Sequence, residues 1–160
     1  MSIKINNKED KTYIVLGAPH SATSFISKIL EESGVEMNNN MDKLYQDYTF
    51  WSTNVRILKK AGGSWDKPPS EKKILATKQD HRIKKHIKRK KSKMWGFKDP
   101  RTSLTIKKYL PHLDGDVYLI CCFRKPKKIL TRNRSKKVTK KLLDRYNRSI
   151  ISAIKEFVEL

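Results

Sequence analysis

The sequence predicts an α/β fold: a three-layer arrangement in which helices flank a parallel β-sheet on both sides. Two observations predict it. Short β-branched, apolar runs alternate along the chain with longer segments of helical periodicity. The apolar runs also lack the inside–outside alternation of a half-exposed strand, which is typical of parallel strands buried on both faces. The length of 160 residues fits one domain, 1–160, whose polar segment 1–11 is expected to be flexible.

Four segments are predicted as strands. The run TYIVLG (12–17) is the first, and VEM (35–37) is a candidate for a short second strand. MWGFK (94–98) is the third, and DVYLICCF (116–123) has the composition of a central strand. The adjacent Cys121 and Cys122 would point to opposite faces of that last strand, and we expect both to be buried, reduced thiols.

Helical periodicity predicts the elements between these strands. The first helix ends at Gly34 and carries a stripe of Phe25, Ile26, Ile29 and Leu30. The second covers 44–61 and ends at Gly62 and Gly63, with an apolar face of Leu44, Tyr48, Trp51, Val55 and Leu58.

Ser70 is then expected to cap a basic helix that runs to about residue 91. Shorter helices are predicted near 102–110 and from Pro126 onward, since proline suits the first turn of a helix. The last helix carries an apolar face of Leu143, Tyr146, Ile150, Ile154 and Phe157.

The chain has a net charge of +21, much of it in the basic runs 81–93 and 124–141. This charge indicates a polyanionic partner (nucleic acid, a phosphorylated cofactor or an acidic acceptor), a lysine-rich background proteome, or both. A solvated helix face is the alternative interpretation of such a run. No stretch is apolar enough to span a membrane, and the polar N-terminus lacks the core of a secretory signal. We therefore expect a cytoplasmic protein.

Polar and cationic groups follow three of the predicted strands. The first strand leads into GAPHSATS, the third into KDPR and the fourth into FRKP. Ligands of open α/β sheets bind at the carboxyl ends of the strands. The three strand ends are therefore predicted to converge on one anion-binding site.

The loop that starts at Gly17 follows the frame of a phosphate-binding P-loop, G-x-x-x-x-G-K-[ST]. Ala22 stands where the second glycine is expected, and Thr23 where the lysine is expected. Nucleoside triphosphate chemistry would also need a carboxylate near Mg²⁺, and no strand offers an evident one. The loop therefore suggests a phosphate-like group that is handled without a metal, with an ordinary strand-to-helix turn as the alternative.

Four motifs, in order, resemble those of the sulfotransferase family, which has a P-loop NTPase-like fold. VLGAPHSATSFISKIL is similar to the family's G-x-P-R-S-G-T-S loop and the helix after it. GGSWDKPP and WGFKDPRTSL resemble the G-G-x-W-x-x-P-P and W-G-x-K-D-P-R elements of its microbial branch. YLICCFRKPKKIL resembles the strand that leads into R-x-P, and LLDRYNRSIISAI the helix that follows. The resemblance covers about 12–160.

The resemblance implies an enzyme that moves the sulfuryl group of 3′-phosphoadenosine-5′-phosphosulfate (PAPS) to a hydroxyl or amine, without a metal. The loop would hold the 5′-phosphosulfate with Pro19, His20, Ser21, Ala22, Thr23 and Ser24. Arg124, and Arg132 in place of a family serine, would hold the 3′-phosphate. His20, Lys98, Asp99 and Arg101 are the candidate catalytic residues. Lys98 and Arg101 would stabilise the departing phosphate. Asp99 would act as the base or, alternatively, cap a turn or pair with Arg101.

Two positions depart from the family pattern. His20 replaces an arginine or lysine, and its protonated form could partly substitute for that cation in a pH-dependent way. Ala22 replaces a glycine, which costs about 1 kcal/mol or more if the position requires a positive φ.

Other functions stay open at this point. The chain could be a catalytically impaired relative that binds nucleic acid or another polyanion, or a P-loop kinase or nucleotide-binding regulator, which the missing lysine disfavours. The acceptor, whether a small molecule, a glycan or a peptide, has no signature in the sequence. His81, His86 and His112 lack metal-ligand spacing, so no metal site is predicted.

Overall fold

A computed structural model describes residues 10–37, 46–90, 92–132 and 137–158. Its described strands form a parallel sheet of order β2-β1-β3, made of β1 (Lys11–Gly17), β2 (Met94–Lys98) and β3 (Asp116–Cys122). Glu36 adds a parallel bridge to Trp95, so the predicted strand at 35–37 is reduced to one bridged residue. The prediction of an α/β fold with a parallel sheet flanked by helices is confirmed.

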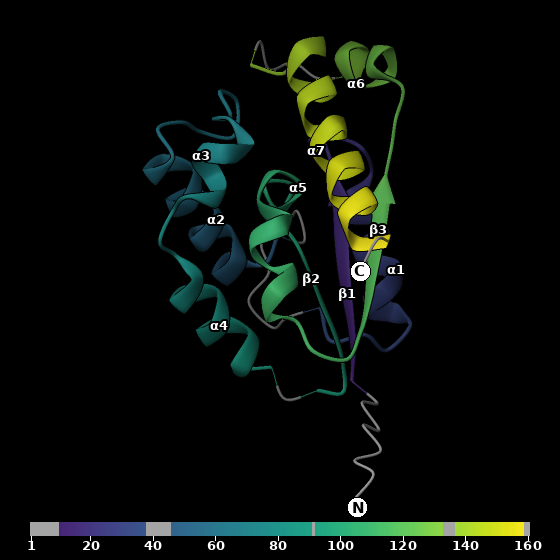
Figure 1. Cartoon of the computed structure of the whole chain (residues 1–160). Coiled ribbons are helices and arrows are strands. Elements are labelled where there is room, and N and C mark those ends of the chain that lie inside the picture. The colour runs from purple at the N-terminus through teal and green to yellow at the C-terminus, as the bar shows by residue number, and fades with distance from the viewer. Residues whose placement is uncertain (1–9, 38–45, 91, 133–136, 159–160) are drawn as a thin grey trace, which may run out of the picture.

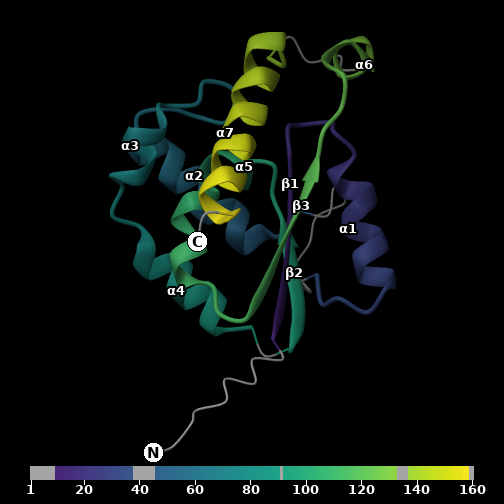
Figure 2. The same ribbon diagram turned by 45° about the vertical axis from the view of Figure 1, so that its right-hand side comes forward.

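Helices cover the two faces of the sheet unequally (Figures 1 and 2). Helix α1 (Thr23–Glu32) lies on one face, where its Ile26 and Leu30 pack near Val15. The opposite face carries the larger core. It is covered by α2 (Tyr48–Lys60), α3 (Glu71–Leu75), α4 (Asp80–Lys88), α5 (Thr102–Thr105) and α7 (Lys140–Val158). The short α6 (Pro126–Arg132) begins at the expected proline and lies beyond the end of β3.

The central strand is β1, and this corrects the prediction for 116–123. Ile14, Val15 and Leu16 are fully buried, whereas β3 forms an edge of the described sheet and leaves Tyr118 42% exposed. Cys121 and Cys122 do face opposite sides of the sheet, but both are only partly buried because no described strand covers β3 on its far side. Composition alone did not distinguish the middle of the sheet from its edge.

The structure changes two helix predictions in the middle of the chain. The basic helix from Ser70 is two helices, α3 and α4, because the chain leaves the helical path between Leu75 and Asp80. Ser70 does cap α3, accepting a hydrogen bond from the Lys73 amide at 3.4 Å. The helix predicted near 102–110 is α5 followed by two 3₁₀ turns, Ile106–Lys108 and Leu110–His112.

Helix α2 buries a different face from the predicted one. It begins at Tyr48, because Asp47 caps it by accepting hydrogen bonds from the amides of Thr49 and Phe50 at 2.9 and 3.2 Å. The buried residues are Phe50, Thr53, Asn54, Ile57 and Leu58, while Tyr48 is 57% and Val55 37% exposed. Leu44, like residues 1–9 of the expected flexible segment, lies outside the described residues, and Lys11 already belongs to β1.

Candidate functional site

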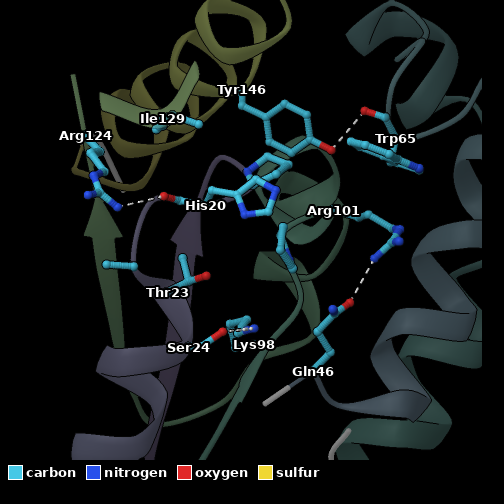
Figure 3. A pocket seen from close by; sticks show the side chains of 13 residues that line it. His20, Thr23, Ser24, Gln46, Trp65, Lys98, Arg101, Arg124, Ile129 and Tyr146 are labelled. Carbon is cyan, nitrogen blue, oxygen red and sulfur yellow. Dashed lines mark hydrogen bonds between the residues drawn. The ribbon is translucent and has the colours of Figure 1, made fainter. Parts of the chain in front are cut away.

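A cavity of about 500 Å³ opens where the carboxyl ends of the three strands meet (Figure 3). Its walls come from the loop after β1, from the segment after β2, from Arg124 after β3 and from helices α6 and α7. The strand ends therefore lie together as the sequence predicted. The volume lies within the range of about 300–1,000 Å³ that is usual for small-molecule sites.

The loop after β1 folds back tightly over its own first residue. A Cβ on Gly17 would overlap the Ser21 hydroxyl and come within 2.6 Å of the Thr23 methyl group, so the position accepts only glycine without a shift of the loop. His20 and Ala22 have φ values of 65° and 71°, in the left-handed region that favours glycine. The loop therefore holds a glycine-type conformation with two residues that carry side chains.

The loop side chains divide between the cavity and the interior. Pro19, His20, Ala22, Thr23 and Ser24 line the cavity. Ser21 is buried and donates its hydroxyl to the Ala18 carbonyl at 2.7 Å. Ser21 therefore stabilises the loop from within and does not itself line the cavity.

Lys98 brings a buried cation to the start of α1. It is the last residue of β2, is 1% exposed and donates from Nζ to the Ser24 hydroxyl at 3.2 Å. Thr23 and Ser24 belong to the first turn of α1, where backbone amides have no carbonyl partner within the helix. The hydroxyls, the helix N-terminus and the ammonium group together form an environment for an anion.

Arg124 closes the other side of the loop. Its guanidinium donates to the His20 carbonyl at 3.4 Å, which connects the end of β3 to the loop after β1 (Figure 3). Arg132, the second arginine predicted to bind the 3′-phosphate, ends α6, but its side chain lies outside the described residues.

Asp99 does not line the cavity. Its carboxylate is fully buried and accepts hydrogen bonds from Arg101 at 2.6 Å and from Asn54 at 2.8 Å. Burial raises the pKa of Asp99, while the positive charge of Arg101 and the Asn54 hydrogen bond oppose that shift. Pairing with Arg101, the alternative considered for the sequence, is what the structure describes.

Arg101 lies in the cavity wall and is directed away from the loop. Its guanidinium donates to Gln46 at 3.2 Å (Figure 3). It also donates to Asp99 and lies 5.8 Å from the Trp51 ring centroid. Its side chain is 17% exposed. Arg101 therefore stabilises the cavity wall through its contacts with Gln46 and Asp99, whereas Lys98 and Arg124 contact the loop and the start of α1.

Sequence reasoning missed the wall opposite the loop. Trp65, Ile129 and Tyr146 line the cavity there, and the Tyr146 hydroxyl donates to the Trp65 carbonyl at 3.0 Å (Figure 3). Burial raises the pKa of Tyr146, which favours the neutral donor. Both aromatic residues stand in quoted motifs, but their periodicity indicated only core packing.

No family model, curated protein or solved structure matches this chain. The resemblance to sulfotransferases consequently rests on the sequence motifs alone. Among the residues that the structure describes, no helix is both long and apolar enough to cross a bilayer. The same residues include no cluster of three or more His, Cys, Asp or Glu side chains that could hold a metal ion.

Proposed function

We propose that the cavity binds PAPS and that the chain transfers its sulfuryl group to a hydroxyl or amine of an acceptor. The observation that carries the proposal is the meeting of the hydroxyl-rich loop, Lys98 and Arg124 in one cavity. Residues far apart in the sequence thus present donors and positive charge to the same volume. The described residues that line it include no carboxylate, which would repel such a ligand.

The lining residues suit the anionic groups of this co-substrate. Thr23, Ser24 and the first-turn amides of α1 would hold the 5′-phosphosulfate, and Arg124 the 3′-phosphate. Bound PAPS would supply an activated sulfuryl group. Lys98 is already directed at Ser24, where its charge would stabilise negative charge as it develops on the phosphate.

Proton transfer is assigned to His20 under this proposal. The acceptor group must lose its proton during sulfuryl transfer, and Asp99 is sealed behind Arg101 and Asn54. The His20 imidazole lines the cavity. It replaces Asp99 as the candidate base.

The test compares the thermal stabilisation given by 3′-phosphoadenosine-5′-phosphate, the desulfonated product, with that given by Mg²⁺–ATP. At a ligand concentration about 100 times Kd, binding adds about 2.7 kcal/mol, or roughly 5 to 10 °C in Tm. We expect this shift for the bisphosphate alone. Arg124→Ala should abolish it, and so should Lys98→Met, which keeps the length of the buried side chain.

Arg148→Ala is the matched control, because Arg148 is exposed and lies outside the cavity. It should retain the full shift. A shift given only by Mg²⁺–ATP, or a bisphosphate shift unchanged in Arg124→Ala, would overturn the proposal. Full bisphosphate binding without turnover of PAPS in the presence of acceptors would support the catalytically impaired alternative.

A further inference from the structure

A second cationic surface lies away from the cavity, on α3, α4 and the end of α2. Two segments of the chain, 59–93 and 124–141, account for its whole net charge. The first segment has 14 Lys and Arg residues against three Asp and Glu residues. Its helices α2, α3 and α4 lie together on the side of the sheet opposite α1 (Figures 1 and 2).

The outer face of α4 carries several exposed cations. His81, Lys84, Lys85 and Lys88 follow helical spacing and are exposed, as is Arg89 at the C-cap. The inner face buries Ile83 and His86. Burial, together with the positive charge of nearby Arg and Lys side chains, lowers the pKa of His86 to about 4.

An open groove of about 530 Å³ lies just before α4 in the chain. Lys60, Lys73 and Lys78 line it together with Thr77, at the junction between the end of α2 and α3. Three exposed lysines therefore line the groove, and four more exposed cations follow along α4 and its C-cap. We define the α4 surface as Lys60, Lys73, Lys78, Lys84, Lys85, Lys88 and Arg89.

The acidic residues of this segment are directed elsewhere. Glu71 pairs with Lys107 at 3.0 Å, Asp80 with Lys108 at 3.2 Å, and Asp66 with Lys137 at 3.9 Å. Within the described part of the chain, none of the seven cations of the α4 surface takes part in an ion pair. Their charge is therefore uncompensated by the protein.

A purely structural role does not account for this pattern. Solvated helix faces are stabilised by pairs of unlike charge at i,i+4. In α4 the i,i+4 neighbours have the same charge: Lys84 lies beside Lys88, and Lys85 beside Arg89. The helix dipole favours Lys85 and Lys88 in the last turn, but it disfavours Lys78, which precedes the N-terminus of α4. The arrangement reduces local helix stability and keeps one sign of charge outward.

We infer that the α4 surface binds the phosphate backbone of a nucleic-acid duplex, independently of the base sequence. Six of its seven cations are lysines, which act as point charges for phosphates. No aromatic side chain belongs to the surface, and single-strand binding would need such stacking platforms. Insertion into a membrane would need exposed apolar groups, of which Leu75 is the one large example on α3 and α4.

The experiment measures the fluorescence anisotropy of a short labelled DNA duplex of mixed sequence from about 50 mM to about 200 mM salt. With about seven phosphate contacts, log Kobs should fall with log salt at a slope of about −6. The variant Lys84→Gln/Lys85→Gln/Lys88→Gln/Arg89→Gln removes four of them. Its slope should be shallower by roughly 3 to 4 units, with weaker binding at low salt.

The matched control is Lys127→Gln/Lys128→Gln/Lys140→Gln/Lys141→Gln, which removes the same charge from exposed positions of α6 and α7. It should keep most of the slope. Equal loss in both variants would mean that net charge alone drives binding, and a larger loss in the control would move the site to α6 and α7. Either result overturns the proposal.

Vesicles containing phosphatidylserine provide a second probe. Binding to vesicles but not to the duplex would also overturn the proposal, in favour of a membrane surface. Circular dichroism should show that the α4 variant melts no lower than the parent, since it removes like-charge pairs. The bisphosphate-dependent thermal shift should be unchanged in this variant, so this test and that of the cavity fail independently.

Discussion

Ala22 illustrates how much a single residue can reveal about the loop. It adopts φ 71°, a left-handed conformation that costs a residue with a Cβ about 1–2 kcal/mol. The sequence raised this possibility because Ala22 stands at a glycine position of the P-loop frame. The structure confirms the positive φ.

Ala22→Gly should therefore stabilise the protein by about 1 kcal/mol, measured by urea unfolding. Ala76→Gly is the control, because Ala76 is exposed and has a right-handed φ of −69° at the end of α3. Glycine should destabilise the protein there by about 0.5–1 kcal/mol. Equal losses in the two variants would contradict the strain assigned to Ala22.

His86 makes the free energy of unfolding depend on pH. The pKa of His86 is about 4 in the folded protein and about 6.5 when unfolded, so folding disfavours its protonated form. The stability it contributes is complete above about pH 6.5 and is lost as the pH falls toward 4. The expected loss between about pH 7 and about pH 5 is roughly 2 kcal/mol.

Urea unfolding of His86→Leu at both pH values checks this expectation. The variant should lack about 2 kcal/mol of the parent's pH dependence. His81→Leu is the control, because His81 is exposed on the opposite face of α4 and should leave that dependence intact. A parent and a His86→Leu variant with the same pH profile would contradict the assignment.

At the scale of elements, α2 is organised around a buried polar network. The Asn54 amide donates to Asp99 at 2.8 Å and to Thr102 at 2.9 Å. Its carbonyl accepts from Thr105 at 2.7 Å and from the Tyr109 hydroxyl at 2.8 Å. This network connects α2 to the segment that carries Arg101.

Asn54→Leu should destabilise the protein by about 3 kcal/mol, since it leaves the Asp99 carboxylate with one partner fewer. Thr53→Val is an adjacent control of nearly equal shape. The Thr53 hydroxyl is buried, with no hydrogen-bond partner in the described structure, so valine should be neutral or stabilising. Chemical unfolding of both variants decides. Equal losses would show that packing, and not the network, supports α2.

The same network explains why the sequence predicted the wrong buried face for α2. The stripe of Tyr48, Trp51, Val55 and Leu58 follows apolar periodicity, yet α2 turns Asn54 inward because four partners satisfy its amide group there. Those partners come from 45 or more residues away, so no local pattern records them. Strand β2, by contrast, has the predicted bounds because its apolar run is bounded by charged residues and needs no distant information.

For the candidate site, the sequence predicted which segments meet but not how each side chain is oriented. The strand-end rule anticipated that residues 19–24, Lys98 and Arg124 would share a cavity. It did not anticipate that Asp99 and Ser21 face the interior, because orientation after a strand depends on buried partners such as Asn54. Trp65 and Tyr146 were missed because aromatic residues in cores and in cavity walls have the same spacing.

At the scale of the whole molecule, charge is the dominant property. A net charge of +21 on 160 residues produces self-repulsion that favours expanded states. Salt screens it over about 8–10 Å at physiological strength. Raising NaCl from about 0.01 M to about 0.15 M should increase stability by on the order of 1 kcal/mol, or about 2–4 °C in Tm. A Tm that stays constant or falls over this range, followed by circular dichroism, would contradict this expectation.

The hydrogen bonds between Gly17 and Ser103 have a mechanical consequence. The Gly17 amide donates to the Ser103 hydroxyl at 2.9 Å, and that hydroxyl donates to the Gly17 carbonyl at 3.2 Å. One side chain thus binds both the amide and the carbonyl of Gly17, the residue at which the loop begins. The start of the loop is therefore connected through a single oxygen atom to α5, the helix that follows the KDPR segment, and we expect a ligand that displaces the loop to displace α5 as well.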